Sequence, residues 1–180
     1  MLRALALCVC LTTATAAGAP QEAIWQGQTV AEWIEQLGDD DERVRWHAAY
    51  ALGQIGPEAS GALDPLAAIL RNDPHEYVRD AAAWALGRMG TKAAPAVELL
   101  TVAMRSNLPS IRRNAATALG NIGTAAEQAT DALVKALDDT DAPVCANAAV
   151  ALWKIGQHPR AIASLIEMTR RTDAPGAFEA

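Results

Sequence analysis

Histidine and cysteine, the side chains that most often bind metals or act as nucleophiles, are few and scattered in this sequence. The chain has 180 residues and three histidines, His47, His75 and His158, which lie in different segments. Metal sites need three or four ligands that converge on one point, and these segments supply no such set. Cys145 has no histidine at a matching level to activate it as a nucleophile, apart from His158 beyond the end of the same predicted helix. We therefore predict no catalytic residue, no metal and no cofactor.

One six-residue sequence occurs four times and indicates how the chain folds. It is A-L-G-Q-I-G at residues 51–56, A-L-G-R-M-G at 85–90, A-L-G-N-I-G at 118–123 and A-L-W-K-I-G at 151–156. The closing glycines are 34, 33 and 33 residues apart. A period of this length is typical of stacked supersecondary units that share one elongated core.

Each unit has the pattern of two helices. Before each closing glycine, apolar residues recur at i, i+4, i+7, i+8 and i+11, which is the buried stripe of a helix. These second helices have their first core residues at Val44, Val78, Ile111 and Val144. Shorter first helices are predicted at about 30–37, 63–70, 96–104, 130–137 and 162–168. Half of all residues are hydrophobic and only 4% are aromatic, and such alanine-rich segments favour closely packed helices.

The helix ends carry recognisable signals. Thr29 and Glu32 have the spacing of a capping box at the start of the first helix. Asp73, followed by a proline and an acid at residue 76, is the predicted N-cap of the second helix of its unit. We expect every second helix to end at its closing glycine in the left-handed conformation.

A helix pair of this length, with an acidic turn and a Val-Arg start to the second helix, resembles HEAT repeats. The similarity is to the short subtype named after the phycobilisome lyases, and it covers residues 29–180. It implies an all-α, right-handed α–α superhelix of about four and a half helical hairpins. The units are expected at about 29–61, 62–95, 96–128 and 129–160, with a partial unit at 161–180.

The resemblance also implies a ladder of charges along the stack. In that family an acid that opens the second helix and an arginine six residues later form this ladder. Two units carry both residues and two carry one: Asp39 with Arg45, Asp73 with Arg79, Arg112 after Ser106, and Asp139 before Cys145. Two alternatives stay open for the incomplete units: Asp139 reaches back to Arg112, or the ladder is broken.

A binding surface is expected on the second helices, which line the concave face in HEAT-like proteins. The positions two and six residues after the first core residue point away from the apolar stripe, and they hold many of the residue types that anchor interfaces. The predicted protein-binding residues are Trp46, His47, Tyr50, Asp80, Trp84, Arg113 and Thr117. The alternative is that these rings only pack over alanine-rich grooves between units. Trp25 and Trp33 are expected to pack at the N-terminal end.

The two ends of the chain suggest export and self-association. Residues 1–19 have the positive start, the apolar stretch and the small residues of a secretory signal peptide, cleaved near Ala16–Ala19. The apolar stretch is too short to span a membrane, so we expect a periplasmic or secreted protein in which residues 20–28 lead into the repeats. Residues 178–180 fall in the first turn of a second helix that does not continue. This uncapped end indicates a longer parent protein, a frayed end or contact with another copy.

These patterns together predict a non-catalytic protein-interaction or scaffold module with an unidentified protein partner. The net charge of −6 argues against a nucleic-acid partner. The resemblance suggests as an alternative a divergent enzyme of the deoxyhypusine-hydroxylase or bilin-lyase type, or a fragment of a larger HEAT protein. The hydroxylases carry His-Glu pairs in second helices that hold two irons, whereas the pair His75-Glu76 lies in a capping turn here.

Overall fold

The computed structural model of the protein describes residues 23–172. The predicted signal peptide and residues 178–180 lie outside this range, and the structure does not test them. The described chain forms four helical hairpins and one further helix, which confirms the predicted all-α solenoid. The hairpins are α1 (Val30–Gln36) with α2 (Glu42–Ile55), α3 (Leu63–Asn72) with α4 (Glu76–Arg88), α5 (Val97–Ala103) with α6 (Pro109–Ile122), and α7 (Thr130–Ala136) with α8 (Ala142–Gly156), followed by α9 (Pro159–Thr172).

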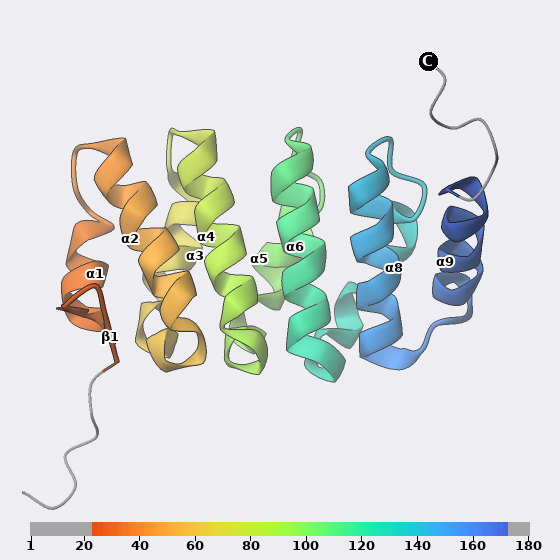
Figure 1. Ribbon diagram of the computed structural model, residues 1–180, viewed down its shortest axis with the longest axis horizontal. Coiled ribbons are helices and arrows are strands. Elements are labelled where there is room, and N and C mark those ends of the chain that lie inside the picture. The colour runs from red at the N-terminus through yellow and green to blue at the C-terminus, as the bar shows by residue number, and fades with distance from the viewer. Residues whose placement is uncertain (1–22, 173–180) are drawn as a thin grey trace, which may run out of the picture.

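The second helices of the hairpins form one layer of an elongated molecule. Figure 1 shows α2, α4, α6 and α8 side by side, with α3 and α5 behind them and α1 and α9 at opposite ends. The most extensive contacts join successive second helices, and each second helix also packs on the first helix of its own unit. The core is therefore continuous along the stack, as expected of a repeat array.

The recurring Ala-Leu-Gly sequence sets the distance between successive second helices. Its leucines, Leu52, Leu86, Leu119 and Leu152, are buried in the core. Its glycines face the alanine of the next second helix so closely that a Cβ on Gly120 would lie 2.9 Å from the Ala151 Cα atom. In the fourth copy Trp153 replaces the glycine and is 44% exposed. The larger side chain fits there because no further second helix follows α8 in the described chain.

The ends of the second helices differ in part from the prediction. Gly56 and Gly123 have φ values of 75° and 74° but ψ values of −133° and −141°, so they are not left-handed helical. They lead instead into 3₁₀ helices, η1 (Gly56–Ala62) and η3 (Gly123–Ala129), and η2 (Gly90–Ala96) follows α4. In the last unit the prediction that the helix ends at Gly156 in the left-handed conformation is wrong. Gln157 takes the left-handed conformation (φ 51°, ψ 42°), because α8 includes Gly156 and no 3₁₀ helix follows it.

The N-terminal lead-in forms a small hairpin that the sequence analysis missed. Strands β1 (Ile24–Trp25) and β2 (Gln28–Thr29) pair antiparallel. The two residues between them, Gln26 and Gly27, both have positive φ, as a tight hairpin turn requires. Trp25 packs on Trp33, whose Nε1 donates a hydrogen bond of 3.3 Å to the Trp25 carbonyl. The predicted capping box of Thr29 and Glu32 is confirmed.

An arginine–aspartate ladder crosses from one unit to the next at the start of the second helices. Arg45 donates to the Asp73 carboxylate at 2.7 and 3.2 Å. Arg112 donates to the Asp139 carboxylate at 2.8 and 2.7 Å, so Asp139 does reach back to Arg112. Inside a unit the arginine bonds a backbone carbonyl six residues earlier. These bonds are Arg45 to Asp39, Arg79 to Asp73 and Arg112 to Ser106.

The ladder acids also hold the turns in which they lie. The carboxylates of Asp39, Asp73 and Asp139 each accept the backbone N–H two residues on, and the Ser106 hydroxyl does the same. The prediction that Asp73 caps α4 is therefore wrong. The N-cap is His75, without a side-chain hydrogen bond, since the Asp73 carboxylate bonds to the His75 N–H and to Arg45. Within the described residues Arg79 has no carboxylate partner, because Ser106 stands where the other units have aspartate.

Candidate protein-binding face

Three aromatic rings stack across the boundary between the first two units. The Trp46 and Tyr50 rings lie 5.5 Å apart at an interplanar angle of 12°, and the Tyr50 and Trp84 rings lie 5.1 Å apart at 9°. The Arg88 guanidinium lies 5.9 Å from the centre of the Trp84 ring. Trp46 is 40% exposed, and Tyr50 and Trp84 are half-buried. We call Trp46, Tyr50 and Trp84 the aromatic column.

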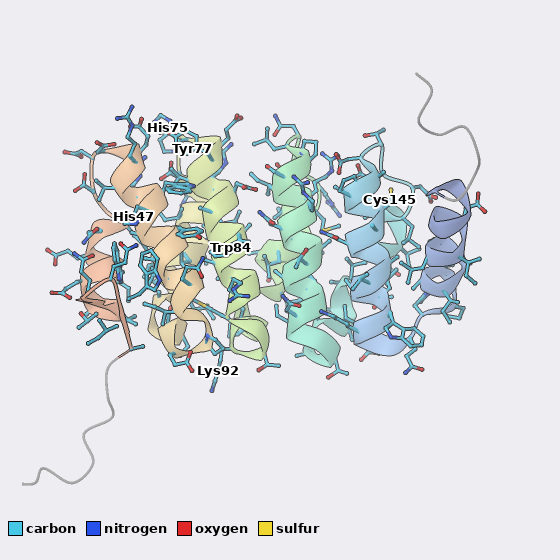
Figure 2. All side chains as sticks on the ribbon, in the orientation of Figure 1. His47, His75, Tyr77, Trp84, Lys92 and Cys145 are labelled. Carbon is cyan, nitrogen blue, oxygen red and sulfur yellow. The ribbon has the colours of Figure 1, made fainter. Side chains whose placement is uncertain are left out.

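Helix geometry and one glycine place these rings together. Trp46 and Tyr50 are four residues apart on α2 and so lie on the same helix face. Trp84 lies on α4 at the position that Tyr50 has on α2. It covers Gly53, where an added Cβ would collide with the indole ring. Figure 2 shows Trp84 at the layer of second helices in the N-terminal half of the array. The column therefore fills a groove between units and also presents its Trp46 end to solvent.

The predicted site residue His47 belongs to the N-terminal packing cluster more than to an open surface. Its ring lies 5.7 Å from the Trp25 ring and 5.2 Å from the Trp33 ring, edge-on in both cases. Trp25 also contacts Tyr50 at 6.0 Å. Because Trp33 is only 2% exposed, this cluster closes the end of the core and supports the aromatic column from one side.

Of the other predicted residues, Asp80 lies on α4 one turn before Trp84, whereas Arg113 and Thr117 lie on α6; asparagine side chains link Asp80 and Thr117 to the next second helix. The Asn114 amide donates to the Asp80 carboxylate at 2.9 Å. The Asn147 amide donates to the Thr117 hydroxyl at 3.0 Å, and Thr117 itself donates to the Arg113 carbonyl. The structure thus brings the three aromatic residues together at the groove between α2 and α4. Arg113 and Thr117 lie farther along the stack, at the groove between α6 and α8.

A second row of bridges was missed by the sequence analysis. The fourth residue of the repeated sequence is polar in every copy, and in the last three copies it reaches the preceding second helix. Arg88 donates to the Gly53 carbonyl, Asn121 to the Gly87 carbonyl and Lys154 to the Asn121 side chain. The signal was present in the repeat itself, as the variable position between the glycine or tryptophan and the isoleucine or methionine.

A small open groove of about 70 Å³ lies between α6 and α8. Small residues, Ala116, Gly120 and Ala151, line it together with Thr117, Asn147, Val150 and Lys154. Val150 occupies the position that Trp84 holds in α4, and Lys154 the position of Arg88. Because valine is much smaller than tryptophan, the groove over Gly120 stays open where the groove over Gly53 is filled. We call this the α6–α8 groove.

The outward-facing side of the second-helix layer carries more cations than acids, although the whole chain is acidic. We compare the positions two, three, six and ten residues after the first core residue of each helix. They hold three cations, Arg88, Arg113 and Lys154, and one acid, Asp80, which accepts a hydrogen bond from Asn114. The Arg113 guanidinium makes no hydrogen bond or ion pair with any described residue. We call the surface formed by these positions the second-helix face.

Most ionisable groups with shifted pKa values belong to the ladder, and one is a buried thiol. Hydrogen bonds from Arg112 lower the pKa of Asp139. Burial alone would raise the pKa of Asp73, but hydrogen bonds from Arg45 and the His75 N–H hold it below its ordinary value. Burial raises the pKa of the Cys145 thiol, which stays protonated at neutral pH. In residues 23–172 no three metal-binding side chains come together, and no helix is long and apolar enough to cross a membrane.

Comparison with known proteins identifies similar repeat structures. The sequence profile of HEAT repeats matches residues 12–87, 63–149 and 97–177. An engineered protein aligns at 27% identity and a TM-score of 0.63, over 78% of this chain and 68% of its own. A designed armadillo repeat protein aligns at 26% identity and a TM-score of 0.62, over 78% and 70%.

The complex of CpcE and CpcF of phycocyanin lyase from Nostoc sp. PCC7120 aligns at 24% identity and a TM-score of 0.58, over 82% of this chain and 92% of that one. At this identity the likeness concerns the fold alone. No curated protein sequence matches the chain significantly.

Proposed function

Because this chain belongs to the HEAT-repeat family, we propose that it is a protein-interaction or scaffold module without catalysis, which holds its partner on the second-helix face. An extended layer of helices offers a long surface in place of an enclosed pocket, which suits recognition of another protein. The partner is a protein rather than a nucleic acid, since the chain as a whole is acidic.

The aromatic column is the observation that carries this proposal. Tryptophan, tyrosine and arginine are the residues that most often dominate the binding energy of protein interfaces. Here two tryptophans and one tyrosine stack with an arginine beside them, and the outermost ring, Trp46, remains 40% exposed. The column is already ordered by packing within the molecule, so little side-chain entropy is lost when a partner covers it.

We propose further that the protein is exported and acts outside the cytoplasm, on the strength of residues 1–19. Expression of the full chain with a C-terminal tag tests this. The expected result is a mature protein in the periplasm or medium whose N-terminus, determined by mass spectrometry, lies just after residues 16–19. Intact protein in the cytoplasm would contradict it.

The first test of function replaces Trp46 by alanine. Affinity capture from cell-envelope extracts, with the purified wild-type protein as bait, should retain a specific partner that Trp46→Ala loses. Removal of an interface anchor of this kind weakens binding by about 2 kcal/mol or more, roughly thirtyfold. Trp46→Ala should lower the free energy of unfolding by about 1–3 kcal/mol, because it removes one ring pair and the area that the partly exposed side chain covers.

The matched control is Val102→Ala. Val102 is 60% exposed on α5, a first helix outside the second-helix layer, so this variant should retain the partner fully. A variant Trp46→Ala that unfolds more easily but captures the partner as well as the wild type would contradict the proposal. The aromatic column would then serve packing alone.

A further inference from the structure

Three grooves separate the four second helices, and the outer two have the same design but different occupants. Between α2 and α4 the Trp84 ring covers Gly53, with the Arg88 guanidinium beside it. Between α6 and α8 the equivalent floor is Gly120 and the equivalent cation is Lys154, but Val150 stands in place of the tryptophan. The outer two grooves therefore differ: one is filled by the molecule's own aromatic ring, and the other is about 70 Å³ in size and has no ring.

Two cations flank the α6–α8 groove. Arg113 lies one helical turn before Thr117, and Lys154 lies one turn after Val150. The Lys154 ammonium group donates one hydrogen bond, to Asn121, and is otherwise exposed, and the Arg113 guanidinium makes no ion pair among the described residues. Arg113 is two residues after the first core residue of α6, and Lys154 is ten residues after that of α8. The two residues are therefore about 12 Å apart along the helix direction.

These features fit an extended acidic segment with one aromatic residue in its middle. In an extended chain, residues one, three and five point to the same face, and four residues cover about 13 Å. An acid at the first and fifth positions can therefore meet Arg113 and Lys154 while the third side chain enters the groove. An aromatic ring there would lie beside Lys154 as Trp84 lies beside Arg88, within reach of a cation–π contact.

We infer that the α6–α8 groove binds an acidic protein segment of the pattern acid-x-aromatic-x-acid. This inference rests on the proposed function and specifies the chemistry of the partner. The ring enters between Thr117 and Val150 over Gly120, and the two carboxylates pair with Arg113 and Lys154. The aromatic column, in the N-terminal half of the same face, then provides a second contact area for the same partner.

The test measures binding of a fluorescein-labelled peptide, Gly-Glu-Ser-Trp-Ser-Glu-Gly, by fluorescence anisotropy at low ionic strength. The expected result is saturable binding that weakens as salt is added, because charge pairing contributes to it. Peptides with alanine in place of tryptophan, or lysine in place of both glutamates, should bind at least tenfold more weakly. No saturable binding up to about 1 mM, which corresponds to a binding free energy of about 4 kcal/mol, would overturn the inference.

Variants of the groove make the test specific. Val150→Trp should fill the groove from within, as Trp84 does, and weaken peptide binding at least tenfold. The control Val150→Thr keeps the groove open and should bind like the wild type. Lys154→Glu and Arg113→Glu should each weaken binding at least tenfold, whereas Lys92→Glu, on η2 at the lower edge in Figure 2, should not. Because Lys154 is exposed, Lys154→Glu remains informative if Val150→Trp fails to fold.

The outcomes separate this inference from the proposed function. Retention of a Trp46-dependent partner together with no binding of the peptide would overturn the inference alone. Failure of both measurements would overturn the proposed function as well. A single-stranded oligothymidylate that binds in place of the peptide and is lost in Lys154→Glu would assign the cations to nucleic acid, which also overturns the inference.

Discussion

At the scale of single residues, two of the ladder acids each make two kinds of contact. Asp73 and Asp139 accept the N–H two residues on and also bind the arginine of the preceding unit. Ser106 keeps the first contact, at 3.2 Å to the Leu108 N–H, but cannot supply the second. Arg79, the arginine that would face it, therefore bonds to the backbone carbonyls of Asp73 and Pro74 and to no carboxylate in the described part of the chain. One serine thus leaves an incomplete position in an otherwise regular ladder.

The variant Ser106→Asp should complete the ladder and stabilise the protein. The new carboxylate can keep the bond to Leu108 and accept from Arg79, which is half-buried. We expect the free energy of unfolding to rise by about 1 kcal/mol, or the melting temperature by about 3 °C. Urea denaturation measures the change. In an Arg79→Ala background the same substitution should give no gain, and an equal gain there would show that the new pair is not the cause.

The two existing pairs predict the effect of breaking them. In the pair of Arg45 and Asp73 the side chains are 11% and 2% exposed, so Arg45→Ala leaves a buried carboxylate without its partner. This variant should lose about 3–5 kcal/mol of unfolding free energy. The matched control is Arg160→Ala, which breaks a pair with Asp138 whose side chains are 52% and 75% exposed. It should lose less than about 1 kcal/mol, and equal losses in both variants would contradict the role of burial.

At the scale of elements, the spacing between second helices depends on glycine facing alanine. A Cβ at Gly120 would lie 2.9 Å from the Ala151 Cα atom, a backbone atom that cannot rotate away. Gly120→Ala should therefore push α8 away from α6 and lower the unfolding free energy by about 1–3 kcal/mol, although alanine favours a helix by about 1 kcal/mol over glycine. Gly61→Ala, where a Cβ meets no atom within 4 Å, should be close to neutral in the same urea titration.

These elements also show how much of the fold was predictable from the sequence. The stack was predicted because a short sequence recurs at a fixed spacing, with its leucine buried in the core of every unit. The β1–β2 hairpin was missed because two strands of two residues give no alternating pattern, and only the positive φ of Gln26 and Gly27 reveals the turn. Asp73 was assigned to the wrong helix end because an arginine 28 residues away competes for its carboxylate.

The candidate site was only partly predictable. Helical spacing correctly placed Trp46, Tyr50 and Trp84 on one face, and the structure shows that their rings stack. The α6–α8 groove could not be seen in the sequence, because it results from the small size of Val150 at a position where another unit has tryptophan. The role of His47 depends on Trp25, which lies in a hairpin that the repeat pattern does not cover.

At the scale of the whole molecule, stability should decrease in acid. The pKa values of Asp73 and Asp139 are lowered in the folded protein, so the folded state holds their charges more strongly than the unfolded chain does. Their contribution to the free energy of unfolding is complete above about pH 5. It is lost below about pH 4, as the pH falls through the pKa values that the two groups have in the folded protein. Urea unfolding between pH 7 and pH 3 measures this loss. Asp139→Asn should show a weaker dependence on pH, and an unchanged dependence would assign it to other groups.

The gap in the ladder has a mechanical consequence. The junctions between the first and second hairpins and between the third and fourth are each fastened by an arginine–aspartate pair, whereas the middle junction relies on packing and on the bridges from Asn114 and Asn121. We expect bending of the rod to concentrate at this middle joint. The aromatic column lies on one side of that middle joint and the α6–α8 groove on the other. A ligand long enough to bind both would therefore fix the curvature of the solenoid.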